Sequence, residues 1–306
     1  MSNTFEGYGL GWRPDLPDIR DYTFDTADVS VKLKSHGQKD SVKSMLKKGG
    51  IGAAKKSPPL KAVQDLRTWC PPVENQGTIG SCTANAGVAL IEFFERKAFG
   101  NHTDASRLFL YKATRNLLGW TGDTGAYLRS TMAAMALFGA PPEKYWPYDT
   151  SKYDVEPPAF CYAFGQSYQS LTYYRLDPPG TAKNVLLARI KMLIAAKLPQ
   201  MFGFTVYNSI GQAGSTGKIP YPAPGDKVSG GHAVVAVGFD DTMKIKNTKP
   251  GSKEYKGAIL IRNSWGTGWG DNGYGWLPYE YVLKGLAVDW WSLLKNEWIN
   301  TGQFGL

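Results

Sequence analysis

The sequence predicts an α+β protein with two lobes, a cleft between them and an N-terminal extension. Residues from about 60 to 165 carry apolar side chains mostly at helical spacing. Residues from about 166 to 290 form mainly short, β-rich segments that glycines separate. Residues 1–58 follow neither pattern, so the two-lobed domain is expected over residues 59–306. A chain of 306 residues with 42% apolar and 13% aromatic side chains can bury two packed lobes.

Three helices are expected in the first lobe, over residues 82–99, 105–119 and 128–140. Each has apolar residues at helical spacing, few helix breakers and a glycine close to its end. One further helix is expected in the second lobe, over residues 181–197, where "TAKNVLLARIKMLIAAK" shows the same spacing. The remaining segments of that lobe are expected as strands: 199–207, 232–240, 257–266 and 273–282.

The extension begins with an aromatic stretch rich in Pro and Asp, "YGLGWRPDLPDIRDYTF", and continues into a lysine run. Between Lys32 and Lys56, eight lysines face one acid, Asp40, and supply much of the net charge of +9. Such a run can attach a protein to nucleic acid or anionic lipid. It lacks the interleaved aromatic residues that stack on bases, which favours a solvated, mobile linker over either partner.

Composition excludes several classes of protein. No apolar run is long enough to span a bilayer, and the first twenty residues lack the pattern of a secretory signal. The cytoplasm is therefore the default location, with non-conventional secretion left open. The histidines His36, His102 and His232 are scattered and no Cys-x-x-Cys spacing occurs, so we expect no metal and no cofactor.

Three cysteines are too few for a disulfide scaffold, and at most one bridge can form. A bridge between Cys70 and Cys161 would leave Cys82 free, but sequence alone does not fix the pairing. Cys82 follows two glycines and a glutamine in "ENQGTIGSCTANAG" and stands at the start of an expected helix. The amide dipoles of a first helical turn favour a thiolate, although one cysteine at a helix start is more often structural.

Two downstream segments supply partners for such a nucleophile. His232 lies in "SGGHAVVAVGFD", after glycines and at the start of an expected strand. Asn263 ends another expected strand in "RNSWGTGWGDNGYGW", where Trp265 follows it closely. An asparagine oxygen can accept the histidine N–H and fix its tautomer, and an indole can shield that bond from water. Nucleophile, base and orienting residue together make the pattern of nucleophilic catalysis.

The combined run, "QG-x-x-GSC-x-A-x-A", then "GHA" 150 residues later, then "NSWGTGWG-x-x-GY", resembles the papain family of cysteine peptidases. The resemblance covers about residues 60–290, and the "RPDLPDIRDY" leader looks like that of bacterial members such as xylellain. It implies a papain-like two-lobe fold, with a helical lobe, a β-barrel-like lobe and an active-site cleft between them.

The resemblance also implies site residues. Cys82 matches the family nucleophile, His232 its base and Asn263 the residue that orients the histidine. Trp265 matches the shielding indole, and Gln76 the side chain that holds the oxyanion together with the Cys82 amide. Tyr127 is expected beside the second-subsite pocket and Trp269 on the leaving-group side. The residues implied to bind substrate are Gly125, Ala126, Tyr127, Gly231, Ala233 and Trp269.

Some positions depart from the family pattern. Ile79 stands where the family has a cysteine, Thr83 follows the nucleophile in place of tryptophan, and Gly231 replaces an aspartate. None of these changes removes a proton-transfer or oxyanion group. Residues 240–257 are an insertion between the histidine and asparagine strands, for which we expect a longer surface hairpin.

The resulting prediction is a cysteine endopeptidase, monomeric, that cleaves polypeptides through a thioester on Cys82. Residues 1–58 are expected either to block the cleft as an inhibitory pro-segment, with the basic linker as its cleavage site, or to complete the fold as an extra strand or flap. Two alternatives remain open for the domain itself: an acyltransferase or amidase acting on a non-peptide substrate, and a binding relative without turnover.

Overall fold

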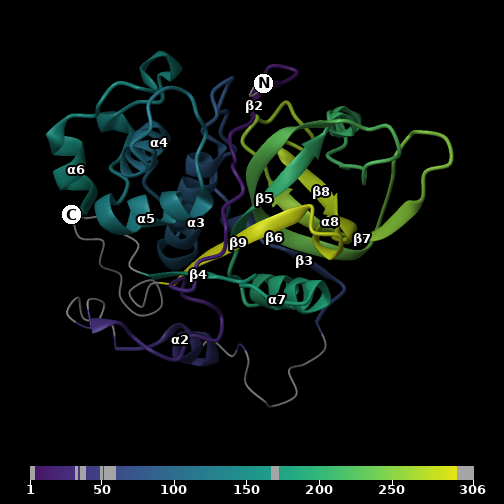
Figure 1. The fold of residues 1–306 in the computed structure, drawn as a ribbon, viewed down its shortest axis with the longest axis horizontal. Coiled ribbons are helices and arrows are strands. Elements are labelled where there is room, and N and C mark those ends of the chain that lie inside the picture. The colour runs from purple at the N-terminus through teal and green to yellow at the C-terminus, as the bar shows by residue number, and fades with distance from the viewer. Residues whose placement is uncertain are drawn as a thin grey trace.

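The structure is a computed structural model that describes residues 4–31, 34, 39–48, 51, 60–166 and 172–294. Its longer helices are α2 (Val42–Lys48), α3 (Cys82–Phe99), α4 (Arg107–Leu117), α5 (Leu128–Phe138), α6 (Ala159–Gly165), α7 (Lys183–Ala195) and α8 (Tyr279–Leu283). Its strands are β1 (Thr4–Phe5), β2 (Tyr8–Gly9), β3 (Val63–Asp65), β4 (Thr172–Arg175), β5 (Gln200–Tyr207), β6 (Val228–Lys246), β7 (Glu254–Arg262), β8 (Tyr274–Pro278) and β9 (Ala287–Leu294). Helices α3 to α6 gather on one side of the molecule and the sheet on the other (Figure 1).

The helices of the first lobe form where apolar spacing predicts them. Helix α3 buries nearly its whole circumference and ends at Gly100, whose φ of 78° is the left-handed geometry that glycine adopts at little cost. The Ser106 side chain caps α4 by accepting the amide N–H of Phe109. Because α3 packs against α4, α5 and strand β6, its first residue lies between the two lobes.

The second lobe is a seven-stranded antiparallel sheet in the order β4-β9-β5-β6-β7-β8, with β3 paired to β6. The α+β class is therefore confirmed, and the described strands form an open sheet, not a closed barrel. The expected hairpin over 240–257 is present, since β6 and β7 pair as far as Lys246 and Glu254. The segment expected as one strand over 273–282 breaks at Pro278, and α8 follows.

The N-terminal extension lies along the junction of the two lobes. In Figure 1 its purple trace runs between the helices and the sheet and then turns beneath them. The amide of Trp12 donates to the carbonyl of Gly231 in β6 (3.1 Å), and the amide of Ala126, just before α5, donates to the carbonyl of Gly11 (2.9 Å). The extension therefore contacts both walls of the junction.

For the rest of the chain, the structure answers one open question, the pairing of the cysteines, and corrects one expectation, that of a solvated linker. All three cysteines are free, and the thiols of Cys70 and Cys161 donate to different carbonyls, those of Leu66 and Tyr145. The lysine run is not solvated throughout, because α2 buries Val42, Met45 and Leu46. Much of the run, including residues 32–33, 35–38 and 52–59, lies outside the described residues. Among the helices that the structure does describe, none has the length and apolar character to cross a membrane.

Candidate active site

Cys82 is the first residue of α3 and is fully buried. The loop before it is fixed from the helical lobe, where the amide of Gly80 donates to the Asp123 carboxylate at 2.8 Å. Burial raises the pKa of the Cys82 thiol to about 11, against the amides of Ala233, Gly11, Thr83 and Trp12, which lower it. The thiolate expected at the helix start is therefore not favoured here, since loss of hydration outweighs the amide dipoles while the extension covers the thiol.

His232 lies on β6, opposite Phe204 of β5. Its Nε2 is 2.7 Å from Oδ1 of Asn263, and the Trp265 indole stacks on the imidazole with ring centroids 4.6 Å apart. Its Nδ1 is buried and has no hydrogen-bond partner within the described chain. Since Asn263 engages Nε2, Nδ1 is the ring nitrogen available for proton exchange. The amide of the adjacent Ala233 lies close enough to Cys82 to lower the pKa of its thiol, so the histidine stands beside the thiol.

Burial also acts on this imidazole. It lowers the pKa of His232 from 6.5 to about 4, and the hydrogen bond to Asn263 opposes that shift. Since the thiol pKa is raised and the imidazole pKa is lowered, both groups are neutral near pH 7. The covered site therefore holds a thiol and an imidazole in place of a thiolate–imidazolium pair.

The side-chain amide of Gln76 lies between the loop before Cys82, the extension and Ser264. Its Nε2 donates to the carbonyls of Ile79 (2.9 Å) and of Gly9 in the extension (3.1 Å). Its Oε1 accepts from the Ser264 hydroxyl at 2.6 Å, which fixes the orientation of the amide. The donor that would serve an oxyanion is therefore engaged by a carbonyl of the extension.

Ser264 is a site residue that sequence reasoning passed over. Besides donating to Gln76, its main-chain amide donates to the Asn263 side-chain oxygen at 2.8 Å. One residue thus orients both the oxyanion donor and the partner of the histidine. Its position inside the "NSWG" run, next to Asn263, was the available signal.

The implied substrate-binding residues contact the extension or its neighbours. Gly125, at a φ of 71°, has no room for a side chain because a Cβ would overlap the carbonyl of Gly11. Ala126 both donates to Gly11 and accepts from Arg13 (3.1 Å), so the two segments run parallel. The ring of Tyr127 packs on Trp120, over which the Arg13 guanidinium lies.

The other wall is formed by the sheet and the tryptophan-rich loop. The carbonyl of Gly231 accepts the Trp12 amide, and Ala233 is buried beside the thiol. Trp269 meets Trp265 edge to face at 5.3 Å. The structure therefore brings the residues predicted as nucleophile, base and orienting residue, and the implied subsites, into one place.

A model of papain family cysteine proteases matches residues 61–283, well over half of the chain. The chain belongs to the papain family of cysteine proteases. Its family membership accounts for the fold and assigns the chain to the hydrolases that act through a cysteine.

Several papain-family proteins are similar to this chain. It is 35% identical over 225 residues to the uncharacterized peptidase C1-like protein L477 of Acanthamoeba polyphaga mimivirus, covering 72% of this chain and 68% of that protein. It is 28% identical to papain of Carica papaya, where the match covers 66% of this chain and 50% of papain. The chain thus spans about half the length of some curated relatives.

Among solved structures, xylellain, a cysteine protease from Xylella fastidiosa, matches with a TM-score of 0.69 and 32% identity. That match covers 94% of this chain and 96% of xylellain, so it includes part of the N-terminal extension.

Proposed function

We propose that this papain-family chain is a cysteine endopeptidase made in an inhibited form. In the open enzyme, His232 takes the thiol proton and the Cys82 sulfur attacks the scissile carbonyl carbon. The amides of Gln76 and Cys82 hold the resulting oxyanion. His232 then protonates the leaving amine, a thioester remains on Cys82, and water activated by His232 hydrolyses it to release the acid and the free thiol.

The observation that supports inhibition is the register of the extension over the site. Gln76 engages the carbonyl of Gly9, whereas the extension amides nearest the thiol are those of Gly11 and Trp12. The oxyanion donor and the nucleophile therefore engage different peptide units of the extension. Attack needs one carbonyl that both groups reach together, so this register resists cleavage while filling the site.

Side chains of the extension add to this cover. The Tyr8 ring stacks on the Trp265 indole at a centroid distance of 4.8 Å, on the indole that also stacks on His232. The Trp12 indole lies against Gly203, where a Cβ would overlap it, and its N–H donates to Asp289 at 3.1 Å. Aromatic burial of this size is worth a few kcal/mol per ring, which suits a segment that must stay bound.

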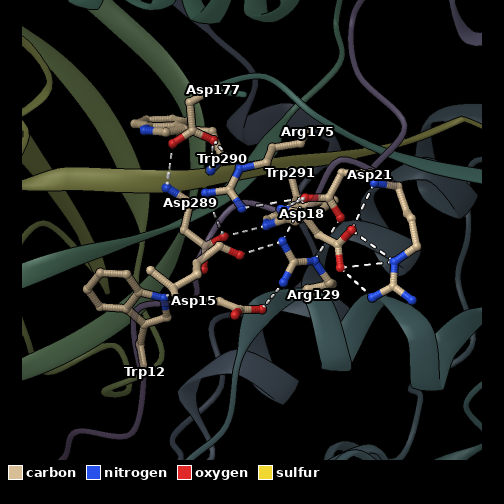
Figure 2. A network of polar contacts seen from close by, with 12 residues as sticks. Trp12, Asp15, Asp18, Asp21, Arg129, Arg175, Asp177, Asp289, Trp290 and Trp291 are labelled. Carbon is tan, nitrogen blue, oxygen red and sulfur yellow. Dashed lines mark hydrogen bonds and ion pairs between the residues drawn. The ribbon is translucent and has the colours of Figure 1, made fainter. Parts of the chain in front are cut away.

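A buried network of charges fastens the following residues (Figure 2). Arg129 of α5 pairs with Asp15 and with Asp21, the latter at 2.7 Å. Arg175 of β4 lies 3.7 Å from Asp21 and 3.5 Å from Asp289, so it connects the extension to the residue that holds Trp12. These ion pairs are largely buried, so removing one partner leaves the other charge buried and uncompensated. Because the pairs connect several residues of the extension, we expect these residues to detach together.

Labelling of Cys82 tests the proposal. The full chain and a chain starting at Ser57 are incubated with a thiol-directed epoxide peptidomimetic, and intact mass is followed with time. We expect one adduct, mapping to Cys82, that forms much faster without the extension. Equal rates would remove the inhibitory role and leave the enzyme, whereas no adduct on Cys82 in either folded chain would overturn both.

Release of the extension is also expected to raise the pKa of His232. Under the extension the imidazole has a pKa of about 4, and exposure to water returns it toward 6.5. The covered state thus binds fewer protons between these values, so on this group alone the extension binds more weakly as pH falls through that window. Proton NMR titration of the imidazole in Cys82→Ala chains with and without residues 1–56 measures the change.

The Cys82→Ala background keeps a thiolate from contributing to this shift. An unchanged His232 pKa would show that the extension does not control hydration of the imidazole.

A further inference from the structure

A second group of titratable side chains lies in the helical lobe, where a loop docks on α3. Two acids of α3 hold this loop by its main chain. Glu92 accepts the amide of Ala105 and Glu95 accepts the amide of Thr103, both at 3.0 Å. The loop residues between and beside these anchors, His102 and Asp104, are thereby brought against Glu92.

The three side chains Glu92, His102 and Asp104 each offer one ligand atom, and these atoms lie within 4.8 Å of one another. Nε2 of His102 is 3.0 Å from an Asp104 carboxylate oxygen. Two ligands bound about 2.1 Å from one metal ion stand about 3.0–3.4 Å apart. The spacing of nitrogen and oxygen is therefore that of neighbouring ligands on one ion.

Two further observations point to a ligand. Nε2 of His102 is buried and has no well-directed hydrogen-bond partner in the described part of the chain, so its nearness to Asp104 does not satisfy it. Glu92 is only 3% exposed, and no lysine or arginine of the described residues forms an ion pair with it. The ligand atoms of Glu92 and His102 lie within 4.8 Å of each other. A cation bound between them would stabilise the buried carboxylate and satisfy the imidazole nitrogen.

The group is open to solvent on one side. Asp104 also lines a cavity of about 520 Å³, together with Glu74 and Glu143. Arg107 pairs with both of those acids, at 2.9 and 3.0 Å, so the carboxylate left for an entering cation is that of Asp104. An ion can reach the group from this cavity without crossing the core.

We propose that Glu92, His102 and Asp104 bind a divalent transition-metal ion, Zn²⁺, with water from the cavity completing its coordination. One imidazole and two carboxylates match the ligand preference of zinc. The ion ties α3 to the loop that precedes α4. Glu92 is ten residues along the helix from Cys82, about 15 Å, so the metal stabilises the helix that carries the thiol and takes no part in hydrolysis.

Zinc titration of the full-length chain in a Cys82→Ala background tests the site, because this background removes zinc binding by the catalytic thiol. After treatment with EDTA and desalting, ZnCl₂ is added in a calorimeter and the Tm is measured in parallel. We expect one Zn²⁺ per chain and a rise in Tm of about 3 °C or more at saturation. His102→Ala and Asp104→Asn in the same background are expected to weaken binding at least about tenfold.

Glu92→Gln is the third variant, since glutamine keeps an oxygen for the Ala105 amide and loses the charge. His232→Gln is the matched control: it removes the histidine of the cleft, so zinc binding should persist. Absence of heat and of a Tm rise at about 1 mM ZnCl₂ would overturn the proposal. Binding that survives His102→Ala and disappears in His232→Gln would overturn it equally, because the ion would then sit in the cleft.

Discussion

Replacing Cys82 with alanine is expected to abolish peptide hydrolysis in a chain freed of its extension. The loss in kcat/KM should be on the order of 10⁴-fold or more, because no other group can form the thioester and what remains is the oxyanion hole and binding alone. The measurement is hydrolysis of a fluorogenic peptide, with a peptide library in parallel to show that amide bonds of polypeptides are the substrate.

Cys161→Ala is the matched control. Cys161 is likewise a buried, free thiol, but it packs with Phe109 and Ala113 away from His232. The two variants remove the same atoms from buried positions, so a difference in activity reports chemistry and not packing. Activity retained by Cys82→Ala would contradict the proposed nucleophile.

The grouping of the candidate catalytic residues could be predicted from the sequence because short motifs encode each part of it. Cys82 follows a glycine-rich turn at a helix start, His232 lies near the beginning of β6, and Asn263 follows directly after β7; apolar runs predict both strands. Neighbouring strands in one sheet then bring the last two together, since β6 pairs with β7. The motifs around Cys82, His232 and Asn263 therefore indicate the site without knowledge of the tertiary packing.

The contacts that hold the extension over the site could not be predicted in this way, because no short motif marks them. Arg129 lies more than a hundred residues from its partners Asp15 and Asp21, and Trp12 meets Asp289 from the opposite end of the chain. Nothing local marks these residues as partners, because their pairing depends on where the extension lies between the lobes. For the same reason the distant interaction of Ser264 with Gln76 appears only in the fold.

The strand β9 shows a different limit. Its sequence "AVDWWSLL" has no clean alternation, because it lies inside the sheet between β4 and β5 and is buried along most of its length. A continuous apolar run of this kind fits a helix or a buried strand equally well. From the sequence, the charged residue Asp289 in this strand would be expected to face solvent. The structure instead buries its carboxylate completely against Trp12, Trp291 and Arg175.

The second large effect is expected from Gly11→Ala, because the main chain of the extension contacts the main chain just before Cys82. Gly11 of the extension lies so near Gly80 that a Cβ at residue 11 would overlap the Gly80 carbonyl oxygen. Backbone atoms next to the nucleophile cannot yield as a flexible side chain would. The change Gly11→Ala is therefore expected to displace the extension while leaving every residue of the two lobes as it is.

The size of this effect follows from the cost of overpacking. A clash with fixed backbone costs about 3 kcal/mol, which corresponds to roughly a hundredfold rise in the fraction of chains with an open site. Full-length Gly11→Ala should thus react with the thiol-directed epoxide about a hundredfold faster than the unchanged chain and should hydrolyse peptides without prior cleavage. Gly9→Ala should act in the same direction, since a Cβ there would overlap the carbonyl of Ile79.

Leu16→Ala is the control for this experiment, because Leu16 belongs to the same segment but the residue is 83% exposed. This change should leave the labelling rate as it is in the unchanged chain. If Leu16→Ala accelerated labelling as much as Gly11→Ala, the extension would be loosely held as a whole and the tight contact at Gly11 would not matter. If Gly11→Ala stayed as protected as the unchanged chain, the extension would not cover Cys82 in this register. Acceleration confined to the two glycine positions would instead tie inhibition to the passage of the extension over Ile79 and Gly80, directly before the nucleophile.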